Sequence, residues 1–376
     1  MISQVARRLV PLTLIAPCAL VPLTPATASS FKVLGSVPGG PVIGAVRSGL
    51  LYGTTPAGYN GASTAGSLFS LSTGGAYTLL RSLNGSPDGN TPNGRLAIDT
   101  TGNIYGTARY GGGYGGGTLW EYSTAGAFTT LHAFGNTGDG AYPLQGPTID
   151  AKGNLYGADS GGAINTDGSV FRLSAAGKYS SMYDFLSGTD GHCPFSGVAV
   201  GKGAFVYGTT VGYGSGGLPL GSVFKLSKSG QFTTLVQFTG GADGDYPDQA
   251  PIVDKQGNVY GTNYQGNQSG FAGAVWTINT ITGLKVLYDF NGNTDGSLPN
   301  SPLVLGRNGT LYGTTEYGGP GGAGSVFAIT PSGTLTVLHA FTGASDGANP
   351  TGNLAIDPAG ALYGGTATGQ IFKIVP

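Results

Sequence analysis

The chain has 376 residues, of which 9% are charged and 39% hydrophobic, with 72 glycines and a formal net charge of −1. This charge balance argues against nucleic acid and anionic membranes as partners, because both require a basic surface. The glycines lie between alternating apolar runs, which excludes collagen and a disordered chain.

Residues 1–28 are predicted to be a signal peptide. Arg7-Arg8 supplies the positive end, 9–23 is an apolar stretch broken by prolines, and 26–28 reads Ala-Thr-Ala, a small-x-small cleavage site. The apolar stretch is too short to span a membrane, so no membrane insertion is expected after cleavage. We expect a secreted protein, extracellular or periplasmic, and its single remaining cysteine, Cys193, leaves no internal disulfide.

A Tyr-Gly motif preceded by an aliphatic residue recurs along the whole chain. The tyrosines are separated by 53, 51, 51, 53, 52 and 51 residues. They are Tyr52, Tyr105, Tyr156, Tyr207, Tyr260, Tyr312 and Tyr363. A fixed period near 50 residues indicates a repeat architecture, and we expect one domain over residues 29–376.

Each period contains four strand-like runs separated by turn residues. In the second period these runs are 95–99, 103–107, 118–122 and 128–134. Four short antiparallel strands in about 50 residues describe one blade of a β-propeller. Several runs are apolar or small on both sides, as expected for sheets that pack face to face.

The two ends of the chain complement each other. Residues 31–37 align with a fourth run, and 353–357, 362–365 and 370–375 supply the first three runs of the last period. The predicted fold is therefore all-β, a seven-bladed β-propeller of four-stranded blades whose last blade is closed by the N-terminal strand. Ring closure removes the exposed sheet edges.

The turns predict two different faces. Tight Asp-x-x-Gly turns such as 99–102, together with the third-to-fourth turns, share what we call the tight-turn face. The opposite, loop-rich face carries Asp-Gly-x-x-Pro links between blades and long glycine-rich loops at 108–117, 158–168, 211–220, 263–273 and 316–324. Function is expected on the loop-rich face.

At this level of detail the chain resembles a known repeat family. The pattern Asn-Leu-Tyr-Gly-Thr-Thr, then Gly-Gly-x-Gly-Ser-Val-Phe, then Leu-x-x-Phe-x-Gly-x-x-Asp-Gly-x-x-Pro is similar to the GloVer tandem repeat, over roughly residues 31–376. The resemblance implies a bacterial secreted or surface protein and brings no established activity. Because the chain ends inside the last blade, a released form is favoured.

The link aspartates occupy equivalent positions and suggest a ring of carboxylates. They are Asp88, Asp139, Asp190, Asp243, Asp295 and Asp346. Clustered carboxylate oxygens suit Ca²⁺, which is therefore the candidate metal and cofactor. In the alternative, each aspartate caps its own turn and no cofactor is expected.

Tyrosines crowd the loop-rich face and are the candidate ligand-binding residues. They are Tyr59, Tyr110, Tyr114, Tyr142, Tyr213, Tyr246, Tyr264 and Tyr317. Aromatic side chains flanked by glycine form rigid platforms on which sugars or protein partners pack. The alternative is that they fold down over the blade edges.

Catalytic patterns are sparse. His132 and His339 occupy matching outer-strand positions, and the neighbours His192 and Cys193 do not favour a nucleophile pair. The loop residues Glu316, Asp159, Asp167 and Arg109 are candidates for a paired-carboxylate glycosidase or lyase site. No zinc-ligand spacing and no phosphate-binding loop is present in the sequence.

Three functions follow from these features. The favoured one is a binding or surface-associated module for an extracellular glycan or polymer. The first alternative is a carbohydrate-active enzyme on the same face, and the second is a scaffold for a protein partner.

Overall fold

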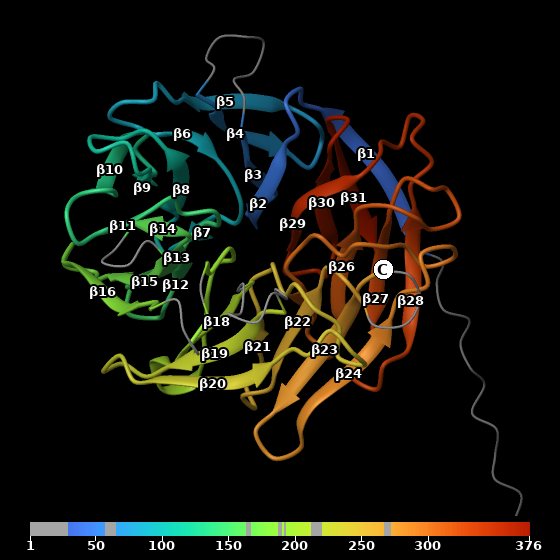
Figure 1. Ribbon diagram of the computed structural model, residues 1–376. Coiled ribbons are helices and arrows are strands. Elements are labelled where there is room, and N and C mark those ends of the chain that lie inside the picture. The colour runs from blue at the N-terminus through green and yellow to red at the C-terminus, as the bar shows by residue number, and fades with distance from the viewer. Residues whose placement is uncertain are drawn as a thin grey trace, which may run out of the picture.

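Seven antiparallel sheets surround a common axis, as the repeat predicts (Figure 1). The computed structural model describes residues 29–56, 65–162, 167–186, 190–191, 193–211, 220–266 and 272–376. Within these ranges no helix is long and apolar enough to cross a membrane. The helical content there is one 3₁₀ turn, η2 (Lys202–Ala204).

The strands follow the repeat in chain order. Blade 1 contains β2 (Val42–Arg47), β3 (Leu50–Thr55), β4 (Ser67–Ser72) and β5 (Tyr77–Ser82). Blade 2 contains β6 (Asn90–Pro92), β7 (Ala97–Ile98), β8 (Ile104–Tyr110), β9 (Thr118–Tyr122) and β10 (Phe128–Ala133). Blade 3 contains β12 (Thr148–Ile149), β13 (Leu155–Asp159), β15 (Ser169–Leu173) and β16 (Tyr179–Asp184), and β11 (Gly140–Ala141) pairs with β14 (Gly161–Gly162).

Blade 4 contains β17 (Ala199–Val200), β18 (Val206–Thr210), β19 (Ser222–Leu226) and β20 (Phe232–Gln237). Blade 5 contains β21 (Ile252–Val253), β22 (Val259–Asn263), β23 (Ala274–Asn279) and β24 (Gly283–Asp289). Blade 6 contains β25 (Val304–Leu305), β26 (Leu311–Thr315), β27 (Ser325–Ile329) and β28 (Leu335–Ala340). Blade 7 contains β29 (Pro350–Ile356), β30 (Leu362–Thr366), β31 (Gln370–Val375) and β1 (Ser30–Ser36).

The innermost strand of blade 2 is shorter than the sequence predicts. In blade 2 the expected run 95–99 contracts to the two residues of β7, whereas the third run, 118–122, coincides with β9. Near the axis the backbone turns toward its neighbour instead of its own blade, and the Leu96 amide donates to the Gly44 carbonyl of blade 1 (3.3 Å). In blade 2 this bond to the neighbouring blade replaces pairing within the blade.

The predicted closure of the ring is confirmed. Strand β1 pairs antiparallel with β31, from Ser30 opposite Val375 to Ser36 opposite Gln370, and so completes the last blade. At the other edge of that blade, β29 contacts β2 of blade 1. Both ends of the chain therefore meet in one sheet, and this blade links the first repeat to the last.

Every blade is built around a glycine under an aromatic ring. A Cβ on the glycine of each Tyr-Gly motif would come within 2.2–2.5 Å of a ring atom on the third strand. The pairs are Gly53–Phe69, Gly106–Trp120, Gly157–Phe171, Gly208–Phe224, Gly261–Trp276, Gly313–Phe327 and Gly364–Phe372. Only glycine leaves room for this contact, which explains the second residue of the motif.

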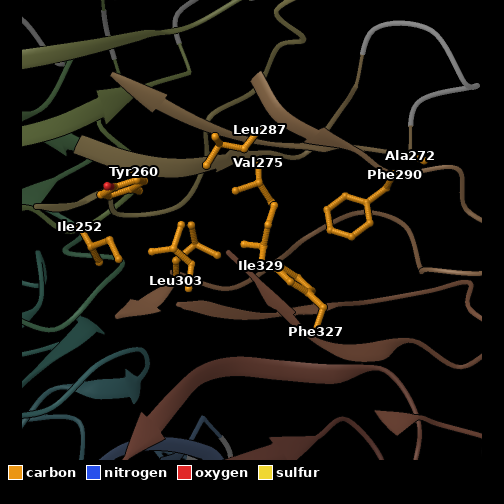
Figure 2. Packing of buried hydrophobic residues seen from close by; sticks show 10 residues of the cluster. Ile252, Tyr260, Ala272, Val275, Leu287, Phe290, Leu303, Phe327 and Ile329 are labelled. Atoms are coloured by element: carbon orange, nitrogen blue, oxygen red, sulfur yellow. The ribbon is translucent and has the colours of Figure 1, made fainter. Parts of the chain in front are cut away.

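Hydrophobic clusters fill the spaces between neighbouring blades. Figure 2 shows the interface of blades 5 and 6, where Tyr260 and Val275 of one sheet face Leu303 and Phe327 of the next. Six further clusters occupy the other interfaces. Both faces of each sheet are therefore buried, in agreement with the apolar runs of the sequence.

The N-terminal strand should be a major determinant of stability. Phe31 of β1 stacks on His339 of blade 6 with ring centroids 3.6 Å apart and meets Phe341 edge-on. Since Phe31 is partly buried, we expect Phe31→Ala to cost about 2 kcal/mol of unfolding free energy, below the loss for a fully buried ring. Chemical denaturation measures this loss. Lys32→Ala on the exposed side of β1 is the control, and equal losses for the two variants would contradict the closure role.

Candidate functional site

The six Asp-Gly-x-x-Pro links hold their aspartates against their own blades. Five of the carboxylates contact the outer-strand side chain seven residues earlier: Asp88–Arg81, Asp139–His132, Asp190–Tyr183, Asp295–Tyr288 and Asp346–His339. The sixth, Asp243, accepts from the Thr239 amide (2.9 Å). Asp190, Asp243, Asp295 and Asp346 also accept from the backbone amide four residues earlier, which is the turn-capping arrangement, whereas Asp88 and Asp139 are held by the side chains of Arg81 and His132.

A Ca²⁺ site formed by the link aspartates would require their carboxylates to converge on one point. Among the residues that the structure describes, no three His, Cys, Asp or Glu side chains converge so that they could hold a metal ion. The calcium site stays a prediction, and it would require carboxylates to leave the partners named above.

The links are clamped to the loops of the preceding blade. The residue before each link proline has a positive φ, 64° at Tyr142 and 55° at Tyr246, which is uncommon for a residue with a side chain. The Tyr142 amide donates to the Gly116 carbonyl (2.7 Å), and a Cβ on Gly117 would lie 2.9 Å from Pro143. This clamp positions the residues that follow each proline near the propeller axis.

These residues enclose a pocket of about 340 Å³. Six of the seven blades contribute to its wall, so it lies on the propeller axis, and we call it the axial pocket. Its polar lining residues are Asn93, Gln145, Gln249, Asn300, Thr351 and Asn353. Pro56 and Ala367, which follow second strands, place it on the loop-rich face. Among the described residues that line it, none is charged.

Several of these polar groups have no partner within the protein. The Asn353 side chain is 3% exposed, and neither its Oδ1 nor its Nδ2 makes a hydrogen bond. The Gln145 Oε1 and the Thr351 Oγ1 are likewise enclosed and unpaired. Leaving a buried polar group without a partner costs about 1–3 kcal/mol. The pocket therefore presents donors and acceptors to something that the chain itself does not supply.

An acidic pair borders the axial pocket. Gln249 donates from Nε2 to Asn300 Oδ1 (3.1 Å), and Asn300 donates from Nδ2 to Glu316 Oε2 (3.0 Å). Gln249 also hydrogen-bonds to the carboxylate of Asp248, whose Oδ1 is enclosed and unpaired. The two carboxylates are thus connected through the amides of the pocket wall.

Burial, with a smaller contribution from the negative charge of Glu316, raises the pKa of Asp248 to about 7. Nearby, burial and both carboxylates raise the pKa of Tyr264, and a hydrogen bond to Glu316 raises the pKa of Tyr317. A carboxyl group that titrates near neutrality beside a second carboxylate is an arrangement found at catalytic sites.

The structure gathers most of the predicted tyrosines into two groups. Tyr110 and Tyr142 lie 5.6 Å apart by ring centroid, with Arg109 over the ring of Tyr110. Tyr264 and Tyr317 accompany the acidic pair, and Tyr246 adjoins Tyr264 through a backbone bond (2.9 Å). Tyr114 is 60% exposed and Tyr317 is 45% exposed. Tyr59 and Tyr213 lie outside the described residues.

The predicted catalytic residues are not all where the sequence suggested. Asp159 is the last residue of β13, not a loop residue, and it is fully buried, accepting from the amide and hydroxyl of Ser169. Burial raises its pKa well above the usual range. Asp159 belongs to blade 3 and Glu316 follows β26 of blade 6, whereas Asp248 is the carboxyl group coupled to Glu316.

His132, His339 and Cys193, the remaining catalytic candidates, lie in environments that suit a structural role. His132 stacks on Tyr179 (3.8 Å), and His339 stacks on Phe31, as expected for blade-edge positions. Burial and the charge of Asp167 raise the pKa of the Cys193 thiol, which is the opposite of activation. His192 lies outside the described residues.

Asp248 and the polar residues that line the axial pocket were not identified as site residues from the sequence. Each follows a link proline by one to three residues, at equivalent positions of different repeats. Comparing these positions between repeats would have shown a run of polar residues that differ from blade to blade. No single repeat contains a catalytic or binding motif, so these residues have no signal within one repeat.

Comparison with solved structures supports the fold. A streptogramin B lyase superposes with a TM-score of 0.60 at 16% identity, over 92% of this chain and 97% of that one. The extracellular domain of a protein described as a hybrid two-component system from B. thetaiotaomicron gives a TM-score of 0.59 at 12% identity, over 92% of this chain and 41% of that one. At these identities the likeness concerns the fold alone. No curated protein sequence matches the chain.

The sequence profile of the Gloeobacter/Verrucomicrobia repeat matches residues 24–219 and 200–376. The two matches together cover the propeller from its first strand to its last, in agreement with the GloVer resemblance of the repeat motif. The chain therefore belongs to the Gloeobacter/Verrucomicrobia repeat family.

Proposed function

We propose that this propeller is an extracellular binding module whose axial pocket and surrounding tyrosines hold a neutral glycan. The observation that carries the proposal is the set of enclosed, unpaired amide and hydroxyl groups at Gln145, Thr351 and Asn353. Sugar hydroxyls both donate and accept hydrogen bonds, so they complement asparagine and glutamine side chains.

The chemistry of the lining supports a neutral ligand. The described lining residues carry no charge, and the carboxylates of Asp248 and Glu316 border the pocket, so an anionic ligand would gain no counterion there. A volume of about 340 Å³ lies within the range of small-ligand sites, roughly 300–1,000 Å³, and suits one or two sugar rings. The exposed rings of Tyr114 and Tyr317 offer flat surfaces to the parts of a chain that extend out of the pocket.

Asn353→Leu separates binding from stability. Removing an unpaired buried amide should leave the thermal midpoint unchanged or raise it, while retention on a neutral polysaccharide falls by about tenfold. The measurement is retention of residues 29–376 on a polysaccharide panel, with and without Ca²⁺, together with a melting curve. Asn308→Leu on the tight-turn face is the matched control and should retain binding.

The same panel distinguishes the aromatic surface from the pocket. Tyr110→Ala and Tyr317→Ala should weaken binding to long chains more than to disaccharides, because the rings lie outside the pocket. Absence of retention by every polysaccharide would overturn the proposal and leave a protein partner as the next hypothesis. Dependence of retention on Ca²⁺ would support the carboxylate ring.

The acidic pair favours a second candidate, a carbohydrate-active enzyme. In glycoside hydrolysis one carboxyl group donates a proton to the leaving oxygen and another activates water. Asp248, with its raised pKa, is suited to be the acid, and Glu316 to be the base.

The raised pKa of Asp248 makes the stability of the protein depend on pH. An aspartate ionises near pH 4 in the unfolded chain and near pH 7 in the folded one, so the wild type loses stability as pH rises through this window. Asp248→Asn should therefore stabilise the protein more at pH 8 than at pH 5, as measured by chemical denaturation. A difference that is the same at both pH values would contradict this assignment.

Glu316→Gln distinguishes enzyme from binder. For an enzyme, new reducing ends should appear with the wild type and fall at least about a hundredfold in the variant, because a general base is lost. For a binding module, no reducing ends should appear with either protein, and retention should change little. Product release that survives the substitution would exclude Glu316 as the base.

A further inference from the structure

A second cavity lies between blades 3 and 4 on the tight-turn face. Its volume is about 680 Å³, twice that of the axial pocket. Its wall includes the blade 3 turn at Lys152, the blade 4 turn at Lys228 and the β15 residue Arg172. Ile149, Met182 and Val200 supply apolar surface. We call this cavity the basic cleft.

Blade 4, which forms one wall of the cleft, is one of three blades that lack the aspartate of the first turn; the others are blades 1 and 6. In blades 2, 3, 5 and 7 the turn after the first strand begins with an aspartate that accepts from the tyrosine hydroxyl of the Tyr-Gly motif, as Asp150 does from Tyr156 (3.1 Å). Blade 4 has Gly201 at this position, followed by η2. The wall therefore lacks a carboxylate on its blade 4 side.

The charges around the cleft are unbalanced. Asp150 is the one acidic group among the described lining residues, and its oxygens already accept from the amides of Lys152 and Asn154 and from two side chains. Among the ion pairs formed by described residues, none involves Lys152, Arg172 or Lys228. Arg172 donates from Nη2 to Asn154 Oδ1 (2.8 Å), and its enclosed Nε has no hydrogen-bond partner.

We propose that the basic cleft binds an organic anion, a carboxylate on a ring-sized apolar or sugar body. The cationic groups select the carboxylate, for which guanidinium and ammonium groups are the usual partners. The apolar wall selects the ring, since a mostly apolar pocket with a few convergent polar groups is the common form of a small-molecule site. This site is independent of the function proposed for the axial pocket, which lies on the opposite face.

The shared chemistry could come from a free aromatic acid or from a uronic acid in a glycan, so the test has an arm for each. Residues 29–376 are titrated with 2-naphthoate and with tetragalacturonate, using 2-naphthamide and maltotetraose as uncharged counterparts, by isothermal titration calorimetry. We expect one of the anions to bind the cleft and its uncharged counterpart not to compete for that site, whether or not maltotetraose occupies the axial pocket. Affinity should fall as salt is added, because the contacts are partly exposed.

Variants locate the binding. Lys152→Gln/Lys228→Gln removes two exposed charges from the cleft and should weaken binding about fivefold or more, at two- to threefold for each charge. Lys255→Gln/Lys285→Gln removes two exposed lysines of blade 5, neither of which lines the cleft, and is the charge-matched control.

Two results would overturn the proposal: no binding of either anion tighter than about 1 mM, or equal weakening by the two double variants. Tight binding of maltotetraose that both double variants leave unchanged would point to the axial pocket instead. Because all four lysines are exposed, none of the variants is expected to affect folding.

Discussion

The contact between a glycine and an aromatic ring, present in all seven blades, is the constraint on which the rest of the structure depends. Because the ring of the third strand lies directly on the second strand, the blade is thin there, and the next blade can pack against its face. The same glycine fixes the position of the tyrosine before it. In four blades the hydroxyl of that tyrosine reaches the aspartate of the first turn, and this bond organises the tight-turn face. One local pattern therefore supplies both the packing of the ring and the geometry of one face.

Because the glycine–ring contact stabilises every blade, the side chains of the loop-rich face can differ from blade to blade. Each link carries a clamp made by a residue of positive φ, a proline and a glycine of the preceding loop, as at Tyr142, Pro143 and Gly117. The residues immediately after the proline then reach the axis on an equivalent backbone but with different side chains. Gln145, Asp248 and Asn300 are examples. A near-symmetric scaffold thus produces an asymmetric pocket, because neutral amides line most of the axis and the acidic pair lies at blades 5 and 6.

The fold could be predicted from the sequence because the repeat is redundant. Seven copies of one pattern outweigh local errors, and the complementary half-repeats at the ends predicted closure by the N-terminal strand. The inner strand of blade 2 was overestimated at residues 95–99, because the Leu96 amide bonds to Gly44 of blade 1 instead of to its own blade. The site was predicted less well. Asp159 was assigned to a loop although it is buried at a strand end, since sequence position does not show the inward turn of the chain. Asp248 acquires its raised pKa chiefly from burial, with a smaller contribution from Glu316, 68 residues away, and neither cause has a local signal in the sequence.

The unpaired polarity of the axial pocket is difficult to explain by folding alone. Asn353 sits in a strand and is almost fully buried, a position at which an apolar side chain of similar size would remove an unfavourable burial of about 1–3 kcal/mol. Elsewhere the chain pairs some of its buried polar groups, such as the hydroxyls of Thr210 and Ser222 (2.8 Å) and the Trp276 indole on Asn263 (2.9 Å), and leaves others unpaired, such as the Trp120 indole. At Gln145, Thr351 and Asn353 four such unpaired atoms belong to the lining of one cavity. Departures from local consistency concentrate at functional sites, so the concentration of these groups on the axis is itself an argument that the cavity is made to be filled.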